Sequence, residues 1–393
     1  MYPGYLKYFY SRYNDAKQLR YDDLYRLLMY ESTEFAASYT RNFLKAGIDA
    51  RCIVGNDLIM QTRWKKENNC PNLNGNDLLT RQVEIWKPEI LWIEDIKSLT
   101  EEWIKSIKQK HKYVKLIGAY HCSPFNQRIL SKLQCVDFVV TCTPGLKQSM
   151  DEAGIKSHLV YHGFDQDFLS RLNMNEVNLY RKIVFSGSLF AGGELHNARI
   201  DLIEKILRAG LGLELYVNLE NPIKIRIKKA LYHISVFLER LGMGGFVKVI
   251  PVLGFSKEPV RNYSKYLLKS AQNPVFGPDM YSLFSKSKIV LNMHLGMAGE
   301  YAGNMRLFEV TGVGSCLLTD NKKNIGDLFV PGREIVVYND PEDCVEKIKW
   351  LLEHEDERNA IALAGNRRTL TDHTVEKRCR QIIGIINTGL NRG

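Results

Sequence analysis

The sequence contains no apolar run long enough to cross a bilayer, which takes about 20 mainly apolar residues. The segment Met1–Tyr5 also lacks the basic start and the apolar stretch of a secretory signal. From these two absences we expect a soluble cytoplasmic protein. The 45% hydrophobic content is ordinary for a globular chain, and 393 residues are enough for two or three domains.

Motifs that hold metals or triphosphates are also missing. The sequence has no HExxH, no paired Cys/His spacing and no phosphate-binding P-loop, which argues against a zinc enzyme and an ordinary NTPase. The one DxD pattern, Asp165-Gln166-Asp167, falls in a polar linker, so we interpret it as chance. No metal site and no cofactor are predicted.

The eight cysteines include no CxxC pair. Several of them, such as Cys52, Cys142 and Cys316, lie in apolar segments, so we expect buried thiols rather than a disulfide framework. Cys122 follows His121 directly, but sequence neighbours rarely form a nucleophile and base pair, and a cysteine nucleophile is disfavoured.

The formal net charge of +10 favours anionic partners without choosing among nucleotides, glycans, nucleic acid and membranes. The basic and apolar segment 222–241 has two interpretations. One is a surface helix with its lysines on the solvent-exposed side. The other is a helix that contacts an acceptor or a membrane surface, and a membrane contact would place the cytoplasmic protein at the inner face of the membrane. Nucleic acid is not expected as a partner, because no recognition motif accompanies the charge.

Short apolar runs alternate with amphipathic helical patterns along most of the chain. This alternation predicts an α/β fold of two doubly wound parallel sheets with helices on both faces. Strands are expected at Ile48–Val54, Glu89–Ile93, Val114–Tyr120, Val136–Val140, His158–His162, Arg181–Gly187, Leu213–Val217, Val247–Pro251, Ile289–His294, Ser315–Thr319 and Glu334–Tyr338. Helices are expected between them, including one patterned over Asp22–Lys45 and one opened by Pro341 with Asp340 as its cap.

The polar stretch Asp165–Arg181 lacks a strand pattern and suggests a domain boundary. We expect an N-terminal domain over residues 1–170, a C-terminal domain over 171–375 and a closing helix over 376–393. The start departs from the pattern, because Tyr2-Pro3-Gly4 looks like a loop that should follow a strand. We expect either that the start lies too far downstream or that the first strand of the domain is absent.

The most informative stretch is Gly303–Glu309, which is followed by a buried strand. It predicts a glycine-opened helix beginning near Asn304, with Met305 and Arg306 in its first turn and Glu309 one turn inside. A helix N-terminus favours anions because its first amides lack backbone partners. A carboxylate one turn inside can accept hydrogen bonds from sugar hydroxyls, so the stretch suits a nucleotide diphosphate carrying a ribose.

Other candidates follow expected strands. Gly187 ends a strand in a glycine turn, and Arg199 opens the next helix, where it either reaches a diphosphate or lies on the surface. The turn Phe276–Tyr281, with Gly277 and Met280, either holds a base or is an ordinary loop. His121 follows a strand of the first domain and either faces the cleft as a sugar or proton site or is a structural histidine.

These residues resemble a known family. Asn304–Asp320, Pro331–Glu334 and Pro341–Leu352 look like the donor domain of GT-B glycosyltransferases, group 1, and are most similar to the CgeB-like members. The tail Ala364–Arg368 and Asp372–Thr374 also fits, and Ser38–Gly47 and Asn56–Trp64 resemble the N-terminal half of less characterised members.

The resemblance implies two Rossmann-like domains around a cleft, a nucleotide sugar in the second domain and the acceptor mainly in the first. It also implies retention at the anomeric carbon without an obligatory metal. It places Glu309 on the ribose, the amides around Gly303–Met305 at the diphosphate, and His121 near the donor sugar. Relatives often carry an acidic residue eight positions before the glutamate, where this chain has Tyr301.

The sequence thus predicts a nucleotide-sugar-dependent transferase of hexosyltransferase type that acts on a glycan, lipid-linked or protein acceptor hydroxyl. The altered acidic position keeps a second hypothesis open, a catalytically inactive glycosyltransferase-like structural or binding protein.

Overall fold

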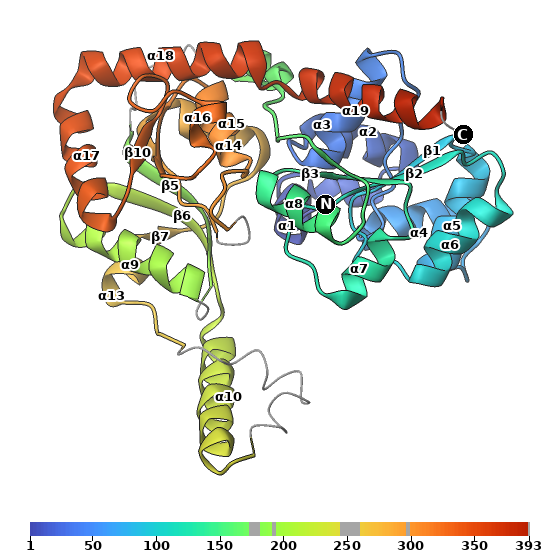
Figure 1. Cartoon of the computed structure of the whole chain (residues 1–393), viewed down its shortest axis with the longest axis horizontal. Helices are drawn as coiled ribbons and strands as arrows, with labels where there is room; N and C mark the ends of the chain where they lie inside the picture. Colours follow the sequence, from blue (N-terminus) through green and yellow to red (C-terminus); the bar gives the residue numbers. More distant parts are fainter. Residues whose placement is uncertain (173–180, 191–193, 244–259, 296–298, 392–393) are drawn as a thin grey trace.

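Two parallel β-sheets, one in each half of the chain, organise the computed structural model (Figure 1). The structure describes residues 1–172, 181–190, 194–243, 260–295 and 299–391. The expected strand Val247–Pro251 lies outside these residues. Within them, no helix is both long and apolar enough to traverse a bilayer.

The first sheet has four parallel strands in the order β1-β2-β3-β4. Its strands are β1 (Ile90–Ile93), β2 (Leu116–Tyr120), β3 (Phe138–Thr141) and β4 (Ser157–Leu159). The helices of this half are α1 (Pro3–Arg12), α2 (Tyr21–Glu31), α3 (Phe35–Lys45), α4 (Leu58–Glu67), α5 (Gly75–Trp86), α6 (Glu101–Lys110), α7 (Gln127–Leu133) and α8 (Pro144–Glu152), with a 3-10 turn η1 (Asn14–Gln18).

The second sheet has six parallel strands in the order β10-β9-β8-β5-β6-β7. They are β5 (Arg181–Leu189), β6 (Leu213–Leu219), β7 (Ala271–Gln272), β8 (Ser287–Leu291), β9 (Cys316–Asp320) and β10 (Val336–Tyr338). The helices are α9 (Glu194–Arg208), α10 (Pro222–Arg240), α13 (Lys265–Ser270), α14 (Gly277–Ser285), α15 (Arg306–Gly312), α16 (Ile325–Leu328), α17 (Pro341–Glu353), α18 (Glu355–Asp372) and α19 (Val375–Leu390), and the 3-10 turn η2 (Gln166–Arg171) precedes β5.

Alternate side chains of β5 pack into two different hydrophobic cores, one on each face of the sheet, as expected for a strand buried on both faces. Ile183 and Phe185 join one core with α9 and α17, whereas Val184 joins the other with α14 and α15. The doubly wound fold class predicted from the alternating pattern is therefore confirmed.

The chain crosses between the halves twice, and the two crossings meet. Phe164, after β4, accepts a hydrogen bond from the Val375 amide and donates its own amide to the His373 carbonyl, over 3.0 and 2.8 Å. Helix α19 then packs its Val375, Cys379 and Ile382 against the first sheet (Figure 1). The C-terminal helix thereby ties the two halves together.

Three predictions about the first half are wrong. Tyr2-Pro3-Gly4 is not a loop, because Pro3 occupies the first turn of α1, where its missing N–H costs nothing. The pattern over Asp22–Lys45 is two helices, α2 and α3, with a break at Ser32–Glu34. Residues 48–54 form no strand. Some of their backbone groups bind side chains instead of a neighbouring strand: the Cys52 amide donates to the Tyr25 hydroxyl, and the Val54 carbonyl accepts from Gln61.

Candidate donor site

The strand order of the second sheet changes direction between β5 and β8, because β6 and β7 continue on one side and β9 and β10 on the other. Such a switch point leaves a crevice at the carboxyl ends of the strands, where ligands bind in open α/β sheets. Gly187, near the end of β5, and Asn292, directly after β8, lie at this point.

A cavity of about 300 Å³ occupies the switch point. Both halves of the chain contribute to its wall, the first half through Tyr2, Thr33 and Glu34. The second half contributes Phe185, Ser186, Gly187, Ser188, Arg199, Tyr216, Asn218, Pro274, Val275, Phe276, Gly277, Met280, Asn292, Asn304, Met305, Arg306 and Glu309. The structure therefore brings together the predicted site residues except His121 and Gly303.

Glu309 is buried in this wall beside a cation. Arg306 Nη1 donates to Glu309 Oε2 over 2.7 Å, and Arg306 Nη2 donates to the Ser186 carbonyl over 3.2 Å. Burial raises the pKa of the Glu309 carboxyl, and the Arg306 guanidinium opposes that rise. Helix α15 begins at Arg306 rather than near Asn304, with Met305 as its N-cap. Glu309 therefore lies in the first turn of the helix rather than deeper inside it.

Arg199 is neither a surface arginine nor a free cation. It is buried, and its guanidinium donates to the Ser188 carbonyl over 3.2 Å and to the Met293 carbonyl. Burial lowers the pKa of Arg199 to about 10, so the group stays charged near neutral pH. It links the carboxyl ends of β5 and β8 within the cavity wall.

Two buried polar atoms of the cavity wall have no hydrogen-bond partner among the described residues, Arg199 Nε and Asn304 Oδ1. The other end of the Asn304 amide is fixed, because Nδ2 donates to Asn292 Oδ1 over 2.8 Å. Buried polar groups without a partner cost free energy, so an unpaired donor and acceptor in one cavity favour a polar ligand there.

Glu34 is a cavity residue that the sequence did not reveal. It lies between α2 and α3, outside any motif, and one carboxylate oxygen accepts the Tyr2 amide over 3.3 Å. Burial raises the pKa of Glu34, and the Glu309 carboxylate across the cavity raises it further. Two carboxyl groups from different halves of the chain thus face the same space.

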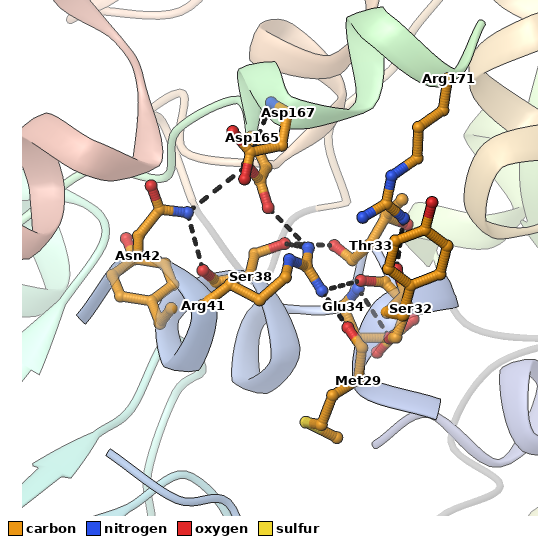
Figure 2. A network of polar contacts seen from close by, with 12 residues as sticks. Met29, Ser32, Thr33, Glu34, Ser38, Arg41, Asn42, Asp165, Asp167 and Arg171 are labelled. Carbon is orange, nitrogen blue, oxygen red and sulfur yellow. Dashed lines mark hydrogen bonds and ion pairs between the residues drawn. The ribbon is translucent and has the colours of Figure 1, made fainter. Parts of the chain in front are cut away.

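A polar network holds the segment Ser32–Glu34 in place (Figure 2). Arg41 Nη1 donates to the Ser32 carbonyl over 2.9 Å and to the Met29 carbonyl, while Arg41 Nη2 donates to Asp165 Oδ2 over 2.6 Å. The Ser32 hydroxyl accepts the Glu34 amide over 3.1 Å. Asp165, from the chance DxD pattern, is therefore a buried ion-pair partner that helps to orient Glu34.

The turn at Phe276 belongs to the contact between the halves. The Phe276 ring lies 5.8, 6.4 and 5.7 Å from the rings of Tyr2, Tyr5 and Tyr8 on or next to α1. Tyr8 and Arg12 also bind Asp279 in the first turn of α14. Gly277 has a φ of +57°, and a side chain there would approach the Glu31 carbonyl. Contacts with α1 therefore already fix the position of this turn, without a bound nucleotide base.

Gly303 lies in a second contact between the halves instead of in the cavity wall. A Cβ on Gly303 would stand 2.8 Å from the Cys142 carbonyl oxygen and even closer to the Thr143 methyl group. Nearby, the Tyr301 ring covers Gly145 at the start of α8, with 2.7 Å to a Cβ placed there. Tyr301 therefore serves packing between the two halves.

His121 is buried directly after β2. It is not among the described residues that line the cavity. Its Nε2 lies 3.3 Å from the Ser123 hydroxyl, and its ring meets that of Phe125 at 6.3 Å. Burial lowers the pKa of His121 to about 4, with Lys97 adding to the effect.

The expectation of buried free thiols is wrong for one pair, because Cys122 and Cys142 form a disulfide. The register of β2 and β3 explains it: Tyr120 pairs with Val140, so the residues two positions on stand side by side, with 5.6 Å between their Cα atoms. His162 lies close to both sulfur atoms, and the three ligand atoms lie within 4.8 Å of one another. With the sulfurs bonded to each other, this group offers no thiolate to a metal.

Comparisons with known proteins bear on the same part of the chain. Residues 237–384 match a family model described as glycosyl transferase-like. A search of the curated proteins found no match.

Several solved structures have a similar fold. One is the Anabaena protein HepE in complex with UDP, with 12% identity, a TM-score of 0.52 and coverage of 79% of this chain and 82% of that one. The same protein in complex with UDP-glucose gives a TM-score of 0.51. A glycosyltransferase from Rickettsia africae gives a TM-score of 0.50 at 12% identity, over 90% of this chain and 88% of that one.

Proposed function

Because this chain has the GT-B fold and a glycosyl transferase-like C-terminal segment, as the resemblance of its sequence predicted, we propose that it moves a sugar from a nucleotide diphosphate sugar to an acceptor hydroxyl. We propose retention at the anomeric carbon and no requirement for a metal. We also propose three parts, namely residues 1–170, which bind most of the acceptor, residues 171–375 and the closing residues 376–393. The protein is proposed to be cytoplasmic.

One observation carries the proposal. The cavity at the switch point between β5 and β8 combines a buried carboxylate, Glu309, with a cation, Arg306, and with two unpartnered polar atoms. A ribose diol supplies donors for a carboxylate, and a diphosphate supplies acceptors for a guanidinium. A nucleotide diphosphate therefore satisfies both kinds of group at once.

The residues take the following roles in this proposal. Glu309 accepts the ribose hydroxyls, and Arg306, with the loop around Asn304 and Met305, meets the diphosphate. Charge develops on the leaving diphosphate as the bond to the sugar breaks, and a cation already in place stabilises it without a metal. The cavity wall contributed by Tyr2 and Glu34 excludes water from the sugar.

Gly277 and Met280 line the cavity and are proposed to meet the base, beside Gly187 and Arg199 at the strand ends. The neighbouring structures with UDP make a uridine nucleotide the first donor to test. The acceptor is proposed to be a glycan, a lipid-linked molecule or a protein.

A thermal-shift screen with UDP, GDP, dTDP and their sugars tests donor binding, followed by measurement of nucleotide release. A ligand at 100 times its Kd should stabilise the folded protein by about 2.7 kcal/mol. Stabilisation by one nucleotide, with release of that nucleotide when an acceptor is supplied, supports the proposal. Stabilisation without release with any acceptor supports the inactive, binding protein instead, and no stabilisation by any nucleotide contradicts both.

A further inference from the structure

Helix α10 (Pro222–Arg240) projects from the second half, away from both sheets, at the bottom of the view in Figure 1. Large apolar side chains along it and just beyond it are between 48% and 64% exposed, namely Ile223, Ile227, Ile234, Phe237 and Leu241. Their spacings of four, seven, three and four residues place them on one side of the helix. The sequence left two interpretations of this segment open, and the exposed apolar stripe favours a helix that contacts a membrane surface or an acceptor.

The borders of the apolar stripe are basic. At about 100° per residue, Arg226 and Arg240 lie along one border and Lys224 along the other, and these three residues are exposed. The only acidic residue within α10 is Glu239, which the same geometry places on the side away from the stripe. Lys228 donates from Nζ to the Glu220 carboxylate over 2.8 Å, so its charge lies on the side of α10 away from the apolar stripe.

We propose that α10 lies in the headgroup region of an anionic lipid membrane, with its apolar stripe directed into the acyl boundary. An apolar face bordered by cations is the arrangement that interfacial helices use, since the stripe leaves water while the cations meet lipid phosphates. The same borders disfavour pairing of two copies of α10, because cations would face cations.

The position of the helix connects this surface with the cavity. Helix α10 starts at Pro222, shortly after β6 ends at Leu219, and Asn218 of β6 lines the cavity. A membrane under α10 would therefore lie near the carboxyl ends of the second sheet. This inference rests on the proposed function: if the cavity holds the donor, a membrane near it favours an acceptor that is held in the membrane, such as a lipid-linked one.

Sedimentation with vesicles tests the lipid surface without requiring catalysis. The full chain is mixed with vesicles of phosphatidylcholine alone or with about 30 mol% phosphatidylglycerol, at low and high salt. We expect at least tenfold tighter binding to the anionic vesicles, weakened by salt. The pair Ile234→Gln/Phe237→Gln and the pair Arg226→Gln/Arg240→Gln should each weaken that binding at least tenfold.

The control is Leu363→Gln/Arg367→Gln, which removes an exposed leucine and an exposed arginine from α18 and should bind vesicles as the unchanged chain does. Equal binding to neutral and anionic vesicles, or full binding by both α10 variants, overturns the proposal. So does a dimer in solution that the Ile234→Gln/Phe237→Gln variant abolishes, since a second copy would then cover the stripe. UDP binding is measured in parallel, so loss of vesicle binding with UDP binding intact, or the reverse, separates this inference from the proposed function.

Discussion

Arg306 and Glu309 form an ion pair in the first turn of α15, with 2.7 Å between Nη1 and Oε2 and both side chains largely shielded from water. The same guanidinium reaches the Ser186 carbonyl and lies 4.6 Å above the Phe284 ring. The pair therefore fixes α15 against the end of β5 before any ligand arrives. A ligand that enters the cavity meets a preset carboxylate and a preset cation.

Removing the cation alone should be costly. We expect Arg306→Met to destabilise the fold by about 3–5 kcal/mol, because it leaves the Glu309 carboxylate buried without its partner. The double variant Arg306→Met/Glu309→Gln should recover part of that loss. Denaturant unfolding of the unchanged chain, both single variants and the double variant gives the coupling energy.

The exposed pair Lys323–Glu300, with 2.6 Å between its charged atoms, supplies the matched control. Solvent-exposed ion pairs contribute little to stability, so Lys323→Met should change the free energy of unfolding little. An Arg306→Met variant as stable as Lys323→Met would show that the ion pair does not stabilise α15.

Acid should weaken the contact where the two chain crossings between the halves meet, at Phe164 and His373. His373 donates from Nε2 to the Leu328 carbonyl over 2.8 Å and accepts Arg378 Nη2 at Nδ1 over 2.7 Å, which requires a neutral ring. Burial lowers the pKa of His373 from 6.5 to about 4. Below pH 6.5 the unfolded chain binds the proton first, so this stability is complete above pH 6.5 and is lost as the pH falls toward 4.

We therefore expect the thermal midpoint to fall between pH 6.5 and 4, and His373→Gln to show a smaller fall over that window. His233→Gln, at an exposed position of α10, should leave the pH profile unchanged. An identical pH profile for His373→Gln and the unchanged chain would be evidence against a role for His373 in acid sensitivity.

The contact of Gly303 with the first half should not tolerate a methyl group. Gly303→Ala sets a Cβ against the Cys142 carbonyl, so we expect the halves to separate at this point, with a cost of about 1–3 kcal/mol and a larger radius of gyration by X-ray scattering. Gly384→Ala, in α19 with open space around it, should leave both quantities near their original values or stabilise slightly. Unchanged scattering and stability in Gly303→Ala would refute the close approach.

The disulfide should stabilise the first half. Cys122 and Cys142 are 20 residues apart, and closing a loop of that length stabilises by about 3 kcal/mol in the chain-entropy model. Reduction with dithiothreitol should therefore lower the thermal midpoint of the unchanged chain. The variant Cys122→Ser/Cys142→Ser should begin at the lower value and show no response to reduction, and a response in that variant would assign the effect to another pair.

Much of the second half could be predicted from the sequence. Strands such as Arg181–Gly187 and Ser315–Thr319 are short, continuous apolar runs between helical patterns, and a parallel sheet is buried on both faces. The strand β5 continues two residues beyond the expected end, to Leu189. The cap of α17 was also predictable, since the Asp340 side chain accepts the Asp343 amide over 2.8 Å.

The first half was harder because its contacts join distant residues. Arg41 and Asp165 are 124 positions apart, and nothing local marks either residue as a support for Glu34. Glu34 also accepts the amide of Tyr2, directly before α1, and that helix was not visible in the sequence pattern. The disulfide likewise depends on the register between β2 and β3, which a single sequence does not show.

The most direct test of the account is calorimetric titration of UDP and of UDP-glucose into the unchanged chain, Glu309→Gln and the control Glu300→Gln. The amide that replaces the Glu309 carboxylate keeps the shape of the side chain but loses its charge and part of its capacity to accept ribose hydroxyls. We predict binding to the unchanged chain and to the control, and at least tenfold weaker binding, about 1.4 kcal/mol, to Glu309→Gln. Equal affinity of all three proteins for the nucleotide would contradict the placement of the donor in this cavity.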